Sequence, residues 1–468
     1  MRNVNWLLGT TVMLSLLIAV PTAFAEDCPC PEVCEGDLNG DCVVDQQDLG
    51  ILLANWGNVC DPFLRCSSWD CYDVKDNADI LAKGGYRGVV SDGQYLYFVP
   101  DRAGSGPLGT PHGEVLRYGL AGDFFDPASW ETFDYGDHCG DDCTDPDSYC
   151  GGAFDGERYV YFAPSQRSSG DHSEVMRYDT WASFGDAASW QTFDPGALGG
   201  YSGAVFAKGY VYFVPYKNSH SGEVLRYDTT GDFSSPASWE TFNAKDAPLS
   251  AKGGYQGAVF DGQQYIYFVP YNGDDDWHGE VLRYDTDQEF TEASSWEKCD
   301  VVALLGAKGG YWGGVFDGEQ YIYFVPFANG NGVMHGEVLR FDTLDPDGFC
   351  DAESWLFYDP GADRVGTDPD GYNRAVFDGQ YVYFVPDQNE GGSANKHGEV
   401  LRYDTSCDFT DPSAWKTFDY GERCAGECDD PDGYAGAVFV APYIYFAPWY
   451  NGTEYHGEVL RYDTTGGN

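Results

Sequence analysis

The chain has 468 residues, of which 43% are hydrophobic and 16% aromatic, and it contains 60 glycines. This length allows a large buried core, and the excess of glycine and aromatic residues is typical of many short strands joined by tight turns. The 76 acidic residues outnumber the 26 basic ones, which gives a formal net charge of −50. Because so negative a surface repels polyanions, the composition argues against nucleic acids and anionic membranes as partners.

Residues 1–25 have the pattern of a signal peptide. Arg2 supplies a short basic region, residues 6–20 are largely apolar, and residues 23–25 have the small-x-small pattern of a cleavage site. The apolar stretch is too short for a good membrane span, and no later segment resembles one. We therefore expect an exported protein that is secreted, periplasmic or held at the cell surface.

The 15 cysteines fit an oxidising compartment, in which disulfides persist. Cys139 with Cys143 and Cys424 with Cys428 share one spacing and one place in the repeat described below, so we expect a local disulfide at each. A zinc site is the weaker alternative, because no further Cys or His pair completes four ligands. The odd total leaves a thiol unpaired. Cys150 is the candidate, since other copies of its strand carry no cysteine.

A twelve-residue segment that begins at Asp37 has oxygen-bearing side chains at the spacing of a calcium loop. Such a loop wraps six or more oxygens around one cation. The predicted ligands are the side chains at positions 1, 3, 5, 9 and 12 and the backbone carbonyl at position 7, which are Asp37, Asn39, Asp41, Asp45, Asp48 and Val43. The apolar residues 49–56 then predict an amphipathic helix that ends at Gly57.

This loop and helix resemble the calcium-binding repeat of dockerins. The resemblance implies an EF-hand-type module over residues 26–66 that binds Ca²⁺, and it raises a cohesin-like protein as a partner. The chain departs from the dockerin pattern in two ways: Cys42 stands at position 6, where glycine is usual, and there is one loop instead of two. An acidic turn that binds no metal is the alternative.

The rest of the chain is built from one repeat of about 50–60 residues. A copy contains a glycine-rich segment such as residues 254–262, an aromatic run such as residues 265–270, the segment 278–286 and a Ser-Trp-x-x-Phe segment. The aromatic runs end at seven prolines, which are Pro100, Pro164, Pro215, Pro270, Pro326, Pro386 and Pro448. An Asp-Gly pair joins the first two segments in most copies and is a strong hairpin signal, so each copy predicts four strands.

Four-stranded units repeated about an axis make a β-propeller. The predicted fold is therefore all-β, with a seven-bladed propeller over residues 67–468 and the small α-helical calcium-loop module in front of it. Trp69 precedes any complete copy, and the last copy stops at Thr464 without a fourth strand. We expect the N-terminal strand to complete the last blade and close the ring. The aromatic and glycine pattern of residues 68–464 resembles kelch propellers, which implies an architecture but no function.

Two kinds of repeated side chain are candidates for function. Glu280 and Arg283 point to opposite faces of a strand, and we interpret this arginine and its copies as structural ion-pair partners. Seven substrate-binding arginines are the alternative. A histidine lies shortly before the glutamate in every copy, as His278 lies two residues before Glu280. It either fixes the loop between the second and third strands or belongs to a repeated pocket. If the histidines belong to repeated pockets, His278, His335 and His397 are ligand-binding candidates.

One position varies while the residues around it repeat. It follows the tyrosine that opens each first strand, and its occupants are Arg87, Cys150, Ser202, Gln256, Trp312, Asn373 and Ala435. In the sixth copy the next residue, a glycine elsewhere, is Arg374. Repetition maintains the scaffold, so departures at the top of the inner strands can encode ligand specificity. The binding candidates are Arg87, Gln256, Trp312, Asn373 and Arg374, although drift at an exposed channel mouth would give the same pattern.

These observations predict a non-catalytic binding or scaffold protein for carbohydrate or protein ligands. Aromatic and polar loop residues suit sugar rings and hydroxyls, and the dockerin resemblance implies a polysaccharide-processing context. The alternative is a glycoside hydrolase or polysaccharide lyase with one site at the channel mouth, near Arg87, Trp312 and Arg374. The sequence has no nucleophile elbow, phosphate loop or zinc-protease motif, and it assigns no catalytic residue.

Overall fold

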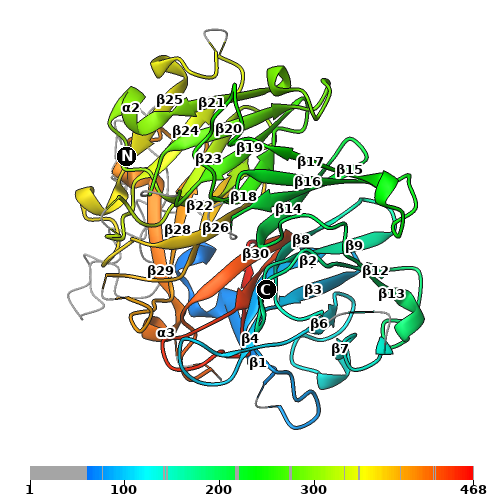
Figure 1. The fold of residues 1–468 in the computed structure, drawn as a ribbon. Coiled ribbons are helices and arrows are strands. Elements are labelled where there is room, and N and C mark those ends of the chain that lie inside the picture. Colours follow the sequence, from blue (N-terminus) through cyan, green and yellow to red (C-terminus); the bar gives the residue numbers. More distant parts are fainter. Residues whose placement is uncertain are drawn as a thin grey trace, which may run out of the picture.

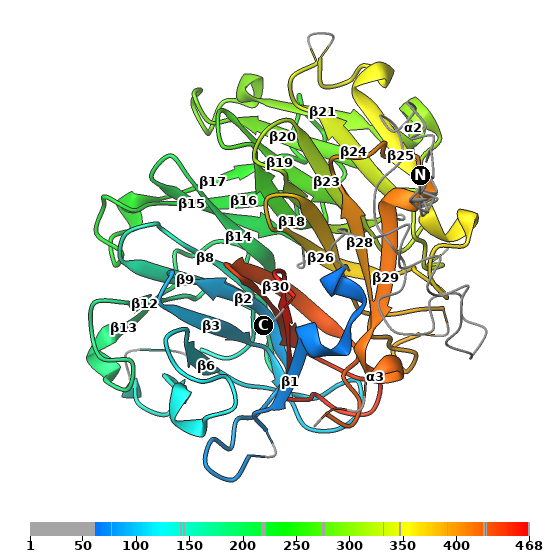
Figure 2. The same ribbon diagram turned by 180° about the vertical axis from the view of Figure 1, so that it is seen from behind.

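The computed structural model describes residues 61–75, 77–140, 143, 146–216, 221–273, 277–330, 332–345, 348–390, 392–424, 426 and 428–466. Within these residues, seven four-stranded antiparallel sheets radiate from one axis (Figures 1 and 2). The predicted seven-bladed β-propeller is confirmed. No helix of the described residues is long and apolar enough to cross a membrane. The predicted signal peptide and the predicted calcium ligands lie outside the described residues.

The strands of each blade run from the axis outward. Blade one is β2 (Tyr86–Ser91), β3 (Tyr95–Pro100), β6 (Glu114–Gly119) and β7 (Trp130–Asp134); blade two is β8 (Tyr149–Phe154), β9 (Tyr159–Pro164), β12 (Val175–Asp179) and β13 (Trp190–Phe193). Blade three is β14 (Tyr201–Ala207), β15 (Tyr210–Pro215), β16 (Glu223–Asp228) and β17 (Trp239–Asn243); blade four is β18 (Tyr255–Phe260), β19 (Tyr265–Pro270), β20 (Glu280–Asp285) and β21 (Trp296–Asp300). Blade five is β22 (Tyr311–Phe316), β23 (Tyr321–Pro326), β24 (Val338–Asp342) and β25 (Trp355–Tyr358); blade six is β26 (Tyr372–Phe377), β27 (Tyr381–Pro386), β28 (Glu399–Asp404) and β29 (Trp415–Asp419). Blade seven is β30 (Tyr434–Val440), β31 (Tyr443–Pro448), β32 (Glu458–Asp463) and β1 (Trp69–Asp73).

Short strand pairs and helices lie outside the four-stranded blades. The strand pairs β4 (Arg102–Ala103) with β5 (Thr110–Pro111) and β10 (Gln166–Arg167) with β11 (Gly170–Asp171) lie in loops between second and third strands. The short helices α2 (Val301–Leu305) and α3 (Tyr420–Arg423) follow the outer strands of blades four and six.

A repeated tryptophan joins each blade to its neighbour. In blade four, the indole Nε1 of Trp296 donates to the carbonyl of Phe290 at 2.9 Å. The Trp296 ring packs on Tyr284 of the same blade and on Phe242 of blade three, with 4.6 Å between ring centroids in both pairs. Such aromatic pairs add about 0.5–1.5 kcal/mol each beyond the area they bury. The tryptophans therefore connect the blades into one core.

The repeated arginine is a structural residue in this frame. Arg283 of β20 places Nη2 2.6 Å from the Glu297 carboxylate of β21. Its guanidinium lies between the rings of Tyr265 and Phe349, 4.2 and 4.4 Å from their centroids, and Phe349 belongs to blade five. These contacts support the interpretation of a structural ion-pair ring over that of seven substrate-binding arginines.

The two ends of the chain meet in blade seven. Strand β1 pairs antiparallel with β32, from Trp69 opposite Tyr462 to Asp73 opposite Glu458 (Figure 2). The predicted closure of the ring by the N-terminal strand is therefore confirmed.

Two disulfides reinforce this closure, and they correct one prediction. Cys66 is bonded to Cys424 and Cys71 to Cys428, so the predicted local bridge between Cys424 and Cys428 is wrong. Both cysteines lie in the segment that leads into β30, and the N-terminal segment packs beside it. Cys424 and Cys428 therefore each form a disulfide with a cysteine of the N-terminal segment.

The remaining cysteines largely follow the predictions. The local Cys139–Cys143 disulfide is present, and Cys150 is free and buried. A further disulfide, which the sequence analysis did not predict, joins Cys299 of blade four to Cys350 of blade five.

The propeller also includes residues that the sequence analysis assigned to the preceding module. Phe63 is fully buried, and its ring lies within 5.7–6.0 Å of the rings of Trp69, Tyr383, Phe418 and Tyr462. The indole Nε1 of Trp69 donates to the Phe63 carbonyl at 3.0 Å, as Trp296 does to Phe290. Phe63, which the sequence analysis placed before the boundary between residues 66 and 67, therefore packs in the core of the propeller.

Candidate ligand-binding cavity at the channel mouth

A cavity of about 810 Å³ opens on the face that carries the loops between second and third strands. Six of the seven blades contribute to its lining, chiefly through the residue after the repeated proline and through these loops. The volume falls in the range of about 300–1,000 Å³ that is usual for ligand sites. This is the candidate functional site.

One wall of the cavity is aromatic and comes from blades four and five. The ring centroid of Trp312 lies 5.0 Å from that of Tyr271 and 4.6 Å from that of Phe327. Trp277, in the loop before β20, packs edge-on against Tyr271 at 4.5 Å and is partly exposed. Large rings that support one another in this way give a rigid apolar surface, because each has few rotatable bonds.

The facing wall is polar and comes mainly from blades one, six and seven. The Arg87 guanidinium lies 5.0 Å from the ring centroid of Trp449 and 5.4 Å from that of Trp312, which brings it across the axis from β2 toward β22. Arg87 Nη1 is 3.8 Å from Asp101 Oδ2. The Asp101 carboxylate accepts hydrogen bonds from Ser148 Oγ at 2.7 Å and from Trp449 Nε1 at 3.2 Å.

A buried ion pair completes the polar wall. Lys396 Nζ lies 2.5 Å from Asp387 Oδ1, and the two side chains are only 2% and 1% exposed. The ammonium also lies 4.9 Å from the ring centroid of Trp449. The two carboxylates that line the cavity in the described part of the chain, Asp101 and Asp387, are thus engaged by donors of the protein itself.

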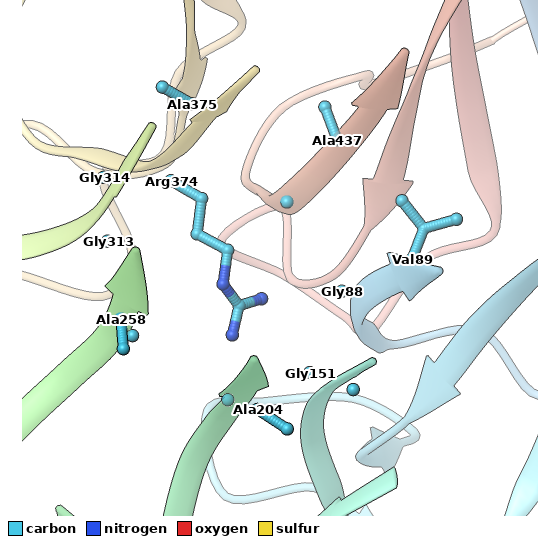
Figure 3. A pocket seen from close by; sticks show the side chains of 14 residues that line it. Gly88, Val89, Gly151, Ala204, Ala258, Gly313, Gly314, Arg374, Ala375 and Ala437 are labelled. Carbon is cyan, nitrogen blue, oxygen red and sulfur yellow. The ribbon is translucent and has the colours of Figure 1, made fainter. Parts of the chain in front are cut away.

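Arg374 lies inside the axial channel and does not line the cavity. Its side chain extends into a space of about 170 Å³ between the inner strands (Figure 3). Nη1 donates to the backbone carbonyls of Ala435 at 2.8 Å and Arg87 at 3.3 Å, and Nη2 is 3.8 Å from Cys150 Sγ. The expectation that Arg374 joins Arg87 and Trp312 at the mouth is corrected.

The glycines around Arg374 explain why it fits. Its φ is +69°, and the six equivalent residues are glycines that also have positive φ. A Cβ atom at Gly88 or Gly151 would lie 2.9 or 2.8 Å from the guanidinium nitrogens. The equivalent residues of the other blades therefore lack side chains where the one arginine extends. Burial lowers the pKa of the guanidinium, so the two carbonyl acceptors offset part of the cost of burying it.

Two other predicted binding residues are buried outside the cavity lining. Gln256 is 0% and Asn373 1% exposed. Ser202 Oγ donates to Gln256 Oε1 and lies 3.4 Å from Cys150 Sγ. Of the five candidates at or beside the variable position, the structure thus brings Arg87 and Trp312 together in the cavity, and it places Gln256, Asn373 and Arg374 elsewhere.

The repeated histidines fix loops. His278 Nε2 bonds to the carbonyl of Gly253 at 2.8 Å, and Nδ1 accepts from the N–H of Glu280 at 3.2 Å. The Glu280 carboxylate in turn accepts from the N–H of Lys252 at 2.6 Å. Both residues thereby fix the loop that leads into β18.

Other copies of this histidine are buried in the same way. His335 makes the same contact with Gly309 at 3.0 Å, and His397 is buried at the equivalent place. Burial lowers the pKa of all three histidines, including His278, to about 4, so they are neutral near pH 7. These contacts support the loop-fixing interpretation.

The sequence analysis missed a second variable ring. The residue after each repeated proline also varies between blades, and six of these seven residues line the cavity, Tyr216 being the exception. The full set is Asp101, Ser165, Tyr216, Tyr271, Phe327, Asp387 and Trp449. The sequence contains the signal for this second ring, because the same comparison of copies that singled out Arg87 and Trp312 would have found it.

Within the described residues, no group of three or more His, Cys, Asp or Glu side chains is arranged to hold a metal ion.

Comparison with known proteins supports the fold and leaves the ligand open. No family model and no curated protein matches the sequence, so neither the dockerin nor the kelch resemblance gains support. Among solved structures, the chain is similar to one described as "YCF48 bound to D1 peptide", with 12% identity, a TM-score of 0.50, and coverage of 85% of this chain and 95% of that one. At this identity the likeness shows the fold alone. The fold and the cavity define a seven-bladed β-propeller, a class whose members commonly bind ligands.

Proposed function

We propose that this protein is an exported, non-catalytic binding protein whose cavity at the channel mouth holds a carbohydrate. The observation that carries the proposal is the pairing of an aromatic wall with a polar wall, on a scaffold whose other positions repeat. A sugar ring has an apolar face of C–H groups and a rim of hydroxyls, so it complements both walls at once. The partly exposed Trp277 is the residue we expect to pack on the sugar.

An enzymatic role is less well supported by the cavity. Glycoside hydrolysis needs two carboxyl groups that flank the scissile bond, one of them able to donate a proton. The two carboxylates among the described lining residues are already engaged, Asp101 by Ser148 and Trp449 and Asp387 by Lys396. Neither is left in position to attack or protonate a sugar without breaking these contacts.

A peptide is the second candidate ligand. The solved propeller of similar fold is described as bound to a peptide, and an extended peptide is recognised by pockets for its side chains. The cavity volume admits a few residues of an extended chain and not a folded domain.

Export and calcium binding complete the proposal. The four disulfides among the described residues support an oxidising compartment. The calcium loop at residues 37–48 rests on the spacing of its oxygens. Calorimetric titration of the mature protein with Ca²⁺ should show saturable binding that the D37A/D41A variant weakens; equal heats from both proteins would remove the loop from the proposal.

The carbohydrate proposal is tested with a glycan array on the mature protein, followed by calorimetry and turnover assays on each hit. We expect W277A to weaken binding about 10-fold, since one stacking aromatic contributes on the order of 1.4 kcal/mol, which is a factor of 10 in affinity. The matched control is W181A, because Trp181 is 67% exposed and lies outside the cavity lining. Unchanged affinity in W277A, absence of any glycan hit, or turnover of a bound glycan would each contradict the proposal.

A further inference from the structure

We propose that the cavity selects an anionic ligand, and that the bound carbohydrate carries a carboxylate, as a uronate does. This inference rests on the proposed function and adds the chemical class of the ligand. It is carried by the charges that line the cavity, by the contacts of Arg87, and by the position of both relative to the aromatic wall.

The cavity gathers cations in a protein that has few of them. Among the described residues, the lining includes Arg87, Arg102, Arg167 and Lys396 but only the carboxylates Asp101 and Asp387. The chain as a whole has 76 acidic and 26 basic residues, so the ratio at this site is the reverse of the average. A low-dielectric cleft with one sign of charge attracts ligands of the opposite sign, and here it does so within a repulsive surface.

The ion pairs of the cavity leave two arginines with one carboxylate. Lys396 is paired with Asp387, and Arg167 lies 3.4 Å from Glu174. Arg87 and Arg102 then share Asp101, at 3.8 and 4.0 Å, and neither distance is that of a hydrogen bond. The positive charge in excess therefore lies at Arg87 and Arg102.

Arg87 is the residue we expect to contact the anion. Its side chain is 12% exposed and Nε is buried, yet in the described part of the chain its guanidinium donates no hydrogen bond. Arg102, in contrast, donates to the carbonyl of Leu108 at 2.7 Å. A desolvated donor without an acceptor is costly, and a carboxylate matches the two parallel N–H groups of a guanidinium. Because Ser148 and Trp449 already use Asp101, an incoming carboxylate is the acceptor that Arg87 lacks.

The aromatic wall decides in favour of a sugar acid over a simple anion. Trp312 is in contact with both the Arg87 guanidinium and the aromatic wall, so the charge and the apolar surface adjoin. A uronate has its carboxylate on the ring itself. Its ring can therefore pack on Trp277 and Phe327 while its carboxylate reaches toward Arg87.

The test compares trigalacturonate with galactotriose, a neutral trisaccharide, by calorimetry on the mature protein at low and at 0.5 M NaCl. We expect the uronate to bind at least about 10-fold more tightly at low salt, and the preference to shrink at high salt. R87Q should weaken uronate binding by a similar factor and weaken binding of the neutral sugar much less, so that the preference for the uronate is lost. The control is R158Q, because Arg158 is a 40% exposed arginine paired with Asp179 outside the cavity lining.

The outcomes separate this inference from the proposed function. Equal affinity for the two trisaccharides overturns the inference while leaving carbohydrate binding intact, and binding of neither sugar contradicts both. Tighter binding of a short peptide than of its C-terminal amide, without uronate binding, would assign the carboxylate to a peptide and overturn the sugar acid. If R87Q does not reach the native near-UV spectrum, R102Q provides the same comparison, and a preference for uronate that survives in a folded variant refutes the role of these arginines.

Discussion

The outer strands and the channel mouth use the same sevenfold frame in opposite ways. On the outer strands a tryptophan occurs in every blade, and each packs between two blades, as Trp296 does between Tyr284 and Phe242. At the start of the inner strands, below the mouth, the equivalent positions of the seven blades carry an arginine, a cysteine, a serine, a glutamine, a tryptophan, an asparagine and an alanine. Positions that join blades are constrained by a neighbour that itself repeats, whereas positions over the axis are free to differ.

Blade seven shows that the repeated frame depends on contacts and not on chain order. Its outer strand comes from the other end of the chain, yet Phe63 and Trp69 reproduce the arrangement of Phe290 and Trp296. The following predictions test how far the frame and the mouth are independent, beginning with the largest expected effect.

Removal of residues 1–75 should break the frame. It exposes the edge of β32, removes Phe63 and Trp69 from the core and eliminates two disulfides, with a loss on the order of 10 kcal/mol. That loss is comparable with the whole stability of a typical domain. We expect aggregation in size-exclusion chromatography, while removal of residues 1–25 alone should have no such effect. A monomeric truncated protein with an unchanged melting temperature would refute the closure.

F63A and F290A should cost similar amounts if blade seven is equivalent to the others. Each removes a fully enclosed ring, so we expect a loss of about 3–5 kcal/mol from the free energy of unfolding for either variant. F125A is the control, since Phe125 is 42% exposed and its loss should cost far less. Urea unfolding measures all three. A small effect of F63A beside a large effect of F290A would show that the N-terminal segment is a loosely attached part of the ring.

These contrasts explain how much the sequence could predict. The strands, the blade count and the ring closure follow from motifs such as the Asp-Gly hairpins and the tryptophans, whose partners lie at fixed places in the repeat. The bridge between Cys424 and Cys428 was predicted wrongly, because disulfide partners depend on which distant segment packs beside them. The location of Phe63 was missed for the same reason.

The position of the Arg374 side chain could not be predicted from the sequence, for a different reason. Simple alternation along β26 places residues 373 and 374 on opposite faces, and the sequence analysis assumed that a large side chain at the axis reaches the mouth. The pairing of β26 with β27 shifts register between Tyr372 and Ala375, and the positive φ of Arg374 turns its side chain into the channel. The glycines at this position in the other copies are consistent with a positive φ, but the sequence alone does not give the φ angle that directs the Arg374 side chain.

Acid should destabilise the frame through its buried histidines. The pKa of His278 is about 4 in the folded protein and 6.5 as an ordinary value, so the unfolded chain binds a proton more readily between these limits. The stabilisation is present above pH 6.5 and is lost as the pH falls toward 4. Between pH 7 and pH 5, wild type should lose about 1–2 kcal/mol more unfolding free energy than H278Q.

The comparison of the two proteins isolates this histidine. Burial also raises the pKa of Asp432 and Glu458 to about 7, and these groups act with the opposite sign, since their stabilisation is lost as the pH rises through 7. They are common to wild type and H278Q, so their effect cancels. H138Q is the control for the substitution itself, because His138 is exposed. An equal loss in H278Q and wild type would show that His278 is not held neutral.

The smallest effect is expected at the outer end of the arginine ring. Glu297 is 59% exposed, and Arg283 keeps its contacts with Tyr265 and Phe349 when the carboxylate is removed. E297Q should therefore change the free energy of unfolding by less than about 0.5 kcal/mol, since exposed ion pairs are screened by water. The equivalent arginine of blade six sets the opposite limit. Arg402 and its partner Asp61 are 3% and 4% exposed, so D61N leaves an uncompensated buried charge and should cost about 3–5 kcal/mol. Urea unfolding of both variants measures the difference, and similar losses would mean that burial of the partner does not decide the strength of the pair.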